Sequence, residues 1–145
     1  MIATIVLVAI MAACAAGTAG IREANNRIQV FGVQLGSTED APWIRGAPAT
    51  EEPCLKGRER YIDTLAISIG YGHNGKIRKI TTRNPGTTMF GIRPGDGFDA
   101  SREKALAAGF KETGAAHRFS SDCCSLTLLV DEGGHVFGMT MELQD

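Results

Sequence analysis

A sequence repeat constrains this chain more than any other feature. Val30 to Ser37 reads VFGVQLGS and Met89 to Asp96 reads MFGIRPGD, at an offset of 59 residues. Each segment has an apolar pair, a glycine, a β-branched residue, a second glycine three positions later and a residue able to cap a helix. The same offset places Gly75 on Gly134, Ile77 on Val136 and Ile80 on Met139. Self-similarity at a fixed offset indicates that one supersecondary unit is present twice.

The second copy shows the order of elements most clearly. Asp96 or Asp99 is expected to cap a helix, which Gly109 ends in a left-handed conformation. A strand over 125–130, a turn at 131–134 and a strand over 135–143 follow. The expected core consists of Phe90, Ile92, Leu106, Phe110, Leu126, Leu128 and Val130. One short helix followed by a β-hairpin is therefore the predicted unit.

The first copy repeats this plan with a shorter helix, because Pro42 removes a backbone donor. A polar loop is expected over 49–60. The alternation in 65–70 predicts a strand with one buried face, and we align 65–69 with 126–130. Ile77 and Ile80 are three residues apart, which interrupts a period of two and predicts a β-bulge. Residues 84–87 link the copies.

These elements predict an α+β fold. Two helix-plus-β-hairpin repeats, spanning residues 28–84 and 87–143, are expected to form an antiparallel sheet with helices on one face.

The first 21 residues differ from the rest of the chain. They contain 17 hydrophobic residues and no charge, which is typical of a signal peptide or membrane anchor. The segment from Met11 to Cys14 is similar to a bacterial lipobox, so Cys14 is a candidate for lipidation. No Lys or Arg precedes the apolar run, so either the true start lies upstream or the segment remains as an anchor. A buried core helix is the alternative. We expect an extracytoplasmic protein, secreted or membrane-anchored.

The charge balance identifies no partner. Fifteen Lys and Arg residues against sixteen Asp and Glu give a net charge of -1, so no nucleic-acid partner is predicted, and membrane contact is expected only through the N-terminal segment. Lys76, Arg78, Lys79 and Arg83 form the one local positive cluster. It is either a solvated strand face or a surface for an acidic partner or anionic envelope polymer.

Three cysteines lie beyond the leader, and they predict one disulfide. In an oxidising compartment we expect Cys54 to bond to Cys123 or Cys124. A metal site formed by the adjacent pair with His117 or His135 is the alternative. Adjacent cysteines match no zinc spacing, so no metal and no cofactor are predicted.

Catalytic patterns are weak. The glycines of 70–75 lie between two strands and open no helix, which argues against a phosphate loop. Ser120, His117 and Asp122 lie in one loop, which does not normally align a nucleophile, a base and an orienting acid. His73 and His135 lie at equivalent hairpins, where solvated histidines are common. The chain is therefore not expected to be an enzyme.

The two FGV-x-x-G and FGI-x-x-G motifs, each before a helix and hairpin and preceded by an export leader, resemble the tandem modules of the β-lactamase-inhibitor-protein family. Residues 74–82 and 89–96 also resemble exported bacterial domains of that architecture. The resemblance covers 28–143 and implies two helices on one face of a sheet whose other face is open and concave. That family has a disulfide in each half, whereas this chain has Cys54 in one copy and an adjacent pair in the other, so no binding residue is carried over.

The expected function is that of an exported or envelope-tethered binding module without catalysis, inhibitor-like or an assembly scaffold. An envelope hydrolase or metal-binding protein that uses the histidines and cysteines is the alternative. The partner is expected to be a protein or an envelope component. It is predicted to contact the open sheet face around Ser68, Arg78, Thr127 and Leu129.

Overall fold

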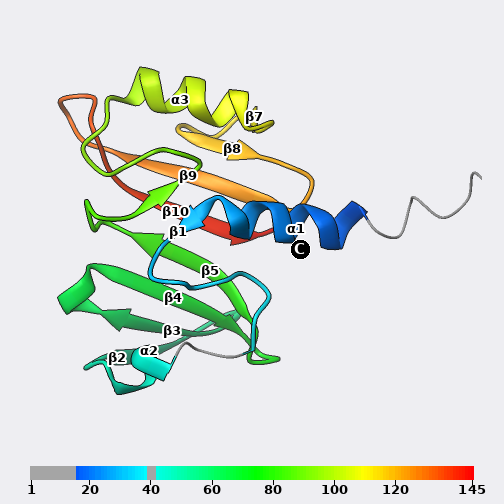
Figure 1. Cartoon of the computed structure of the whole chain (residues 1–145), viewed down its shortest axis with the longest axis vertical. Coiled ribbons are helices and arrows are strands. Elements are labelled where there is room, and N and C mark those ends of the chain that lie inside the picture. Colours follow the sequence, from blue (N-terminus) through cyan, green and yellow to red (C-terminus); the bar gives the residue numbers. More distant parts are fainter. Residues whose placement is uncertain (1–15, 39–41) are drawn as a thin grey trace, which may run out of the picture.

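The chain is organised around one large sheet. The computed structural model describes residues 16–38 and 42–145, and Figure 1 shows an antiparallel sheet running along the molecule. In spatial order its eight strands are β2 (Thr50–Cys54), β3 (Gly57–Ile62), β4 (Ile67–Gly72), β5 (Ile77–Thr82), β10 (Val136–Leu143), β9 (Cys124–Val130), β8 (Arg118–Ser120) and β7 (Lys111–Glu112). The predicted combination of a large antiparallel sheet with few helices is confirmed.

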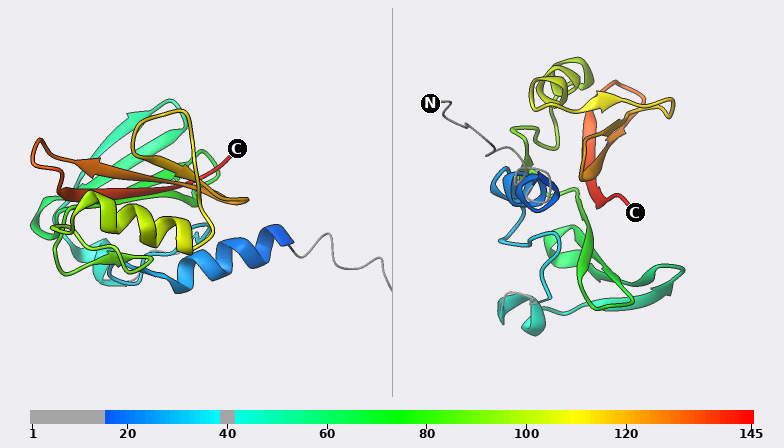
Figure 2. Two further views of the ribbon diagram at one scale, coloured as in Figure 1. Left: turned by 90° about the horizontal axis from the view of Figure 1, so that it is seen from above. Right: turned by 90° about the vertical axis from the view of Figure 1, so that its right-hand side faces the viewer.

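The helices lie on one side of this sheet. They are α1 (Ala16–Asn26), α2 (Pro42–Gly46) and α3 (Phe98–Ala107), and a single 3-10 turn, Asp63–Leu65, precedes β4. The edge-on view in Figure 2 places the described helices α1, α2 and α3 on the same side of the strands. Two short strands, β1 (Ile28–Gln29) and β6 (Thr88–Met89), pair with each other outside the large sheet. Among the described helices, none is long and apolar enough to cross a membrane.

The hydrophobic core fills the space between the sheet and the helices. Alternate residues of the strands supply it, because successive side chains of a strand point to opposite faces. The fully buried members include Ile62, Ile69, Ile80, Leu126, Met139, Met141 and Phe119. Ala24 of α1 and Ile44 of α2 are buried against this layer. The face away from the helices is left for polar side chains.

Two glycine turns, at Gly36 and Gly95, join the loops that contain them to the sheet by equivalent backbone hydrogen bonds. The Gly36 N–H donates to the Ile77 carbonyl at 2.7 Å, and the Gly95 N–H donates to the Val136 carbonyl at 2.6 Å. Gly36 has a φ of 81° and Gly95 a φ of 108°, a region that favours glycine. Both bonds join residues that the sequence offset of 59 relates.

A β-bulge interrupts each of the two long hairpins. Arg78 is the extra residue on β5, and Phe137 is the extra residue on β10. Because of the first bulge, Ile77 and Ile80 are both buried although they are three residues apart. The predicted bulge is therefore confirmed.

Helix α3 ends as predicted but begins differently. The Gly109 N–H donates to the Leu106 carbonyl at 3.0 Å and the Phe110 N–H to the Ala105 carbonyl at 3.1 Å, which is a Schellman stop. At the other end the capping residue is Gly97, without a side-chain cap. The predicted aspartate cap is wrong, because the Asp96 carboxylate accepts the Arg93 N–H instead.

The buried side of α3 also differs from the prediction. Ser101 and Ala105 are the helix residues with no exposed surface, whereas Leu106 is only half-buried. Val130 is likewise half-buried. Small residues therefore occupy the fully buried positions of α3, and Leu106 packs at the edge of the core.

The predicted polar loop over 49–60 is wrong, since β2 and most of β3 lie there. β2 is exposed on both faces and contains Pro53, which is tolerated because β2 is an edge strand. The predicted strand start at Leu65 is also wrong, because Ala66 has a φ of 52° and breaks the alternation. Pairing of Ile69 with Ile80 and of Leu128 with Met139 relates β4 to β9 at an offset of 59, which corrects the alignment of 65–69 with 126–130.

The N-terminal segment lies partly outside the described residues. The candidate lipidation residue Cys14 is among those that are not described. In the described residues helix α1 spans Ala16–Asn26, so it includes the last residues of the predicted leader. Asn25 fastens this helix to the following loop, because its side-chain amide accepts the Leu35 N–H at 2.8 Å and donates to the Leu35 carbonyl at 3.0 Å.

Candidate functional site

The candidate site is the side of the sheet away from the helices, called the open face here. Directly opposed residues of an antiparallel pair lie on the same face, so the strand register traces one row across six strands. From β3 to β8 this row consists of Tyr61, Ser68, Thr81, Thr140, Thr127 and Arg118. All six side chains are polar, and they form the middle of the open face.

Two of the predicted binding residues, Ser68 and Thr127, belong to this row. Ser68 is 8% exposed, and its hydroxyl donates to the Glu59 carboxylate at 3.2 Å. Thr127 is half-buried on β9. Between them the hydroxyls of Thr81 and Thr140 are 3.0 Å apart across the central strand pair. Hydrogen bonds therefore hold the side chains of Ser68, Thr81 and Thr140 in place before any partner arrives.

The third predicted residue, Arg78, lies in a cluster of paired charges. The bulge brings Arg78 and Lys79 to one concave region, where they line the same hollow as Glu59 and Glu142. The Arg78 guanidinium donates to Glu142 at 2.9 Å, and the Lys79 ammonium is 3.4 Å from Glu59. We call these four residues the ion-paired cluster. The chain itself neutralises the charge of Arg78, whose side chain is 15% exposed.

The neighbourhood of the fourth predicted residue, Leu129, is different. Leu129 faces Gly138 across the strand pair, and Phe137 at the bulge is 42% exposed. The Arg83 guanidinium lies over the Phe137 ring, 5.7 Å from its centroid. We call Arg83, Leu129, Phe137 and the nearby Arg118 the Phe137 patch. Within the described residues, neither of its two arginines belongs to an ion pair.

Sequence reasoning missed Phe137 as a site residue. The sequence placed Arg83 in the positive cluster with Lys76, Arg78 and Lys79. In the structure Arg83 follows the last residue of β5, whereas the other three lie near its first residue. The usable signal was the offset of 59, which places Phe137 on Arg78. A bulge predicted at one hairpin therefore implied an outward residue at the other.

The two ends of the open face also differ in the position of a glycine. Gly70 faces Lys79 in the first hairpin, whereas Leu129 faces Gly138 in the second. A Cβ at Gly138 would lie 2.9 Å from Arg83 Cγ and 3.1 Å from Leu129 Cδ1. The side chains of Arg83 and Leu129 therefore both lie next to the space above Gly138.

Charges on the open face perturb two ionisable groups. The pKa of Tyr61 is raised, mainly because the Glu59 carboxylate is close to its phenol. The pKa of Asp145 is lowered, mainly because it accepts a hydrogen bond from Lys56. Both effects come from the side of the face that holds the ion-paired cluster.

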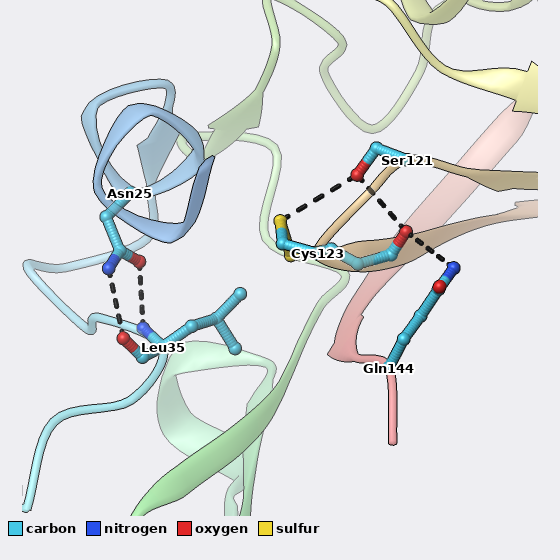
Figure 3. The surroundings of a disulfide bond; sticks show 6 residues. Asn25, Leu35, Ser121, Cys123 and Gln144 are labelled. Carbon is cyan, nitrogen blue, oxygen red and sulfur yellow. Dashed lines mark hydrogen bonds between the residues drawn. A yellow bond between two sulfur atoms is a disulfide. The ribbon is translucent and has the colours of Figure 1, made fainter. Parts of the chain in front are cut away.

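The structure corrects the predicted disulfide. Cys123 is bonded to Cys124, and Cys54 is free and exposed. Cys54 ends the edge strand β2, five strand spacings or roughly 24 Å from β9, far beyond the reach of a disulfide. Figure 3 shows the bonded pair held by neighbours: the Gln144 side chain donates to the Cys124 carbonyl at 3.1 Å, and the Ser121 hydroxyl lies 3.7 Å from Cys123 Sγ.

The residues of the alternative hypothesis do not meet. The His73 ring makes a hydrogen bond with the Leu55 carbonyl, and the His117 ring packs on the Phe98 ring. Nδ1 of His135 lies 3.8 Å from the Asp131 carboxylate. In residues 16–38 and 42–145 no three His, Cys, Asp or Glu side chains gather into a possible metal site. The disulfide occupies both sulfurs that the predicted metal alternative required.

A cavity lies on the other side of the sheet. It has a volume of about 320 Å³ and lies between α1 and the end of α3. Arg27, Phe90, Phe110, Lys111 and Cys123 contribute to its walls. Acidic side chains also line it, so its charge selects no class of ligand.

Comparison with known proteins found no matching family model, no matching curated protein and no matching solved structure. The resemblance to the β-lactamase-inhibitor-protein family stays a prediction from the sequence motifs.

Proposed function

We propose that the chain is an exported or envelope-tethered binding module without catalytic activity, which binds a protein or envelope component on its open face. The observation that carries this proposal is the Phe137 patch. It combines an exposed aromatic ring, a leucine and two arginines without an ion-pair partner in the described residues, on the face that no described helix covers. Aromatic residues and arginine are enriched at the energetic centres of protein interfaces.

The shape of the sheet supports this choice of face. In the edge-on view of Figure 2, the β2–β3 hairpin and the loop before β8 extend to the side opposite the helices. The open face therefore lies between two projecting ends. A partner seated there would contact strands and hairpin tips together.

We also propose that the fold consists of two copies of one helix-and-hairpin unit. Three features recur at an offset of 59 residues and support the proposal: the glycine turns at Gly36 and Gly95, their bonds to Ile77 and Val136, and the bulges. Export is supported by the apolar composition of residues 1–21.

Photo-crosslinking tests the proposed function. A crosslinking amino acid placed at Thr140 lies in the middle of the open face, and the same amino acid at Lys104 lies on the exposed side of α3. In cells of the source organism, we expect one discrete partner to crosslink from position 140 and none from position 104. The adduct should disappear when Thr127→Arg fills the same face.

Equal crosslinking from both positions, or an adduct that persists in a folded Thr127→Arg protein, would show that the open face is not the binding surface. Mass spectrometry of the adduct would identify the partner.

A further inference from the structure

The two ends of the open face offer a partner different electrostatics. At the ion-paired cluster, Arg78 and Lys79 are compensated by Glu142 and Glu59. At the Phe137 patch, Arg83 and Arg118 have no acidic partner within the described residues. A carboxylate of a partner therefore gains the most favourable electrostatic energy at the Phe137 patch, because it displaces no existing ion pair there.

The apolar part of the patch is arranged around Gly138. Arg83 and Leu129 approach the space above this glycine from neighbouring strands. The Arg83 guanidinium lies 5.7 Å from the Phe137 ring centroid, within the range of a cation–π contact. This contact restricts the Arg83 side chain in part, so less conformational entropy is lost when the guanidinium binds a carboxylate.

Arg118 extends the patch across β9. It faces Thr127, which is two residues from Leu129 on the same face of the strand. Diagonal neighbours of this kind lie about 7–8 Å apart. The patch thus presents an apolar centre, Leu129 with Phe137, between two guanidinium groups.

We infer that the Phe137 patch binds an acidic protein segment in which an aromatic or aliphatic side chain is flanked by carboxylates. The inference rests on the proposed function and adds the partner's chemistry to it. The apolar side chain covers Leu129 and Phe137, while the carboxylates pair with Arg83 and Arg118. Guanidinium groups suit this partner, since they can bind carboxylates in a bidentate way.

Peptide selection tests the inference. A phage-displayed library of random peptides is selected on the immobilised full chain, and enriched peptides are synthesised with a fluorescent label. We expect Asp and Glu to be enriched next to aromatic or aliphatic residues. In fluorescence anisotropy, the double substitution Arg83→Ala with Phe137→Ala should weaken binding at least tenfold, about the effect expected when one interface centre is lost.

Two further variants separate fold effects from contact effects. Arg118→Glu leaves the apolar centre untouched and should weaken binding several-fold, most strongly at low salt. Arg45→Ala is the matched control, because Arg45 is an exposed arginine on α2, which lies on the helix side of the sheet. It should bind within twofold of the unmodified chain. Circular dichroism confirms that each variant is folded.

The remaining outcomes distinguish this inference from the proposed function. Peptides that bind the double variant as well as the unmodified chain, but fail to bind Thr140→Arg, would overturn the patch and keep the open face. If the enriched peptides bind all these variants with unchanged affinity, or if no peptide is enriched, both the Phe137 patch and the open face are excluded as the binding surface. Arg83-dependent binding of a labelled single-stranded oligothymidine would overturn the acidic segment in favour of a nucleic acid.

Discussion

Arg78 and Phe137 occupy the same position in two bulged hairpins of one sheet, 59 residues apart in the sequence. One side chain is held in an ion pair with Glu142, while the other is an exposed ring beneath a guanidinium. The same outward-facing bulge position therefore occurs twice in the sheet. It carries an ion-paired arginine in one hairpin and an exposed aromatic ring in the other. The binding specificity proposed for the open face follows from this difference.

The turns that precede the helices should respond alike to substitution. Gly32 and Gly91 have φ values of 75° and 76°, and no atom closer than 4.0 Å would meet a Cβ at either position. Gly32→Ala and Gly91→Ala should each lower the free energy of unfolding by about 1 kcal/mol, because alanine tolerates this conformation poorly. Urea denaturation measures the change. Gly114→Ala is the control, because Gly114 has no positive φ and has open space around it. If the losses of unfolding free energy for Gly32→Ala and Gly91→Ala differ by more than twofold, the two turns are not equivalent.

Loss of the Arg78 ion pair should have a modest, salt-dependent effect. Arg78→Ala removes a 2.9 Å bond to Glu142 between partly buried side chains. We expect the free energy of unfolding to fall by about 1 kcal/mol, a typical upper value for such pairs, and by less in molar salt. Denaturation at two salt concentrations measures this. An unchanged difference at high salt would show that lost packing, not charge, is responsible.

The sequence predicted those parts of the fold that local chemistry determines. Gly109 before Phe110 ended a helix, and the spacing of Ile77 and Ile80 required a bulge, because both signals lie within a few residues. The same holds for the open-face positions Ser68 and Thr127, which follow from the period of two along a strand.

Features that depend on distant parts of the chain were not predictable in this way. β2 and β3 lack a clear apolar alternation, since β2 is exposed on both faces, and only pairing with β4 defines them as strands. The partner of Cys54 was inferred without knowing how many strands separate it from Cys123. Neutralisation of Arg78 depends on Glu142, which is 64 residues away.

The thiol chemistry of the three cysteines beyond residue 15 should follow the observed bonding. We expect iodoacetamide to label Cys54 in the native protein and to leave Cys123 and Cys124 unlabelled until a thiol reductant is added. Peptide mass spectrometry measures the labelling at each cysteine. Cys54→Ser should abolish native labelling within this region, and a Cys54-linked peptide in the unreduced digest would contradict the structure.

The helix–sheet contact should be sensitive to added volume more than to removed volume. Ala105 is fully buried, so Ala105→Leu should lower the free energy of unfolding by about 1–3 kcal/mol through overpacking. Leu106→Ala removes a half-buried side chain and should cost about 1 kcal/mol, below the range for a fully buried leucine. Urea denaturation compares the two. A larger loss for Leu106→Ala would place Leu106, not Ala105, at the centre of the interface.

Titration of Tyr61 should report the charge environment of the open face. The nearby Glu59 carboxylate raises the pKa of Tyr61 above its usual value, because a negative charge disfavours the phenolate. The folded chain therefore holds this proton to higher pH than the unfolded chain. The associated stability is present below the unfolded pKa and is lost as the pH rises through the folded pKa.

The measurement uses Tyr71→Phe as the background, since Tyr61 and Tyr71 are the two tyrosines of the chain. Near-ultraviolet absorbance of the tyrosinate should then give a single titration, and Glu59→Gln should shift it to lower pH. Glu112→Gln is the matched control. Glu112 lies on the edge strand β7, far from Tyr61 on β3, and its carboxylate pairs with Arg102 of α3. If Glu59→Gln and Glu112→Gln titrate identically, Glu59 does not set the charge around Tyr61, and the proposed compensation of Lys79 by Glu59 loses its support.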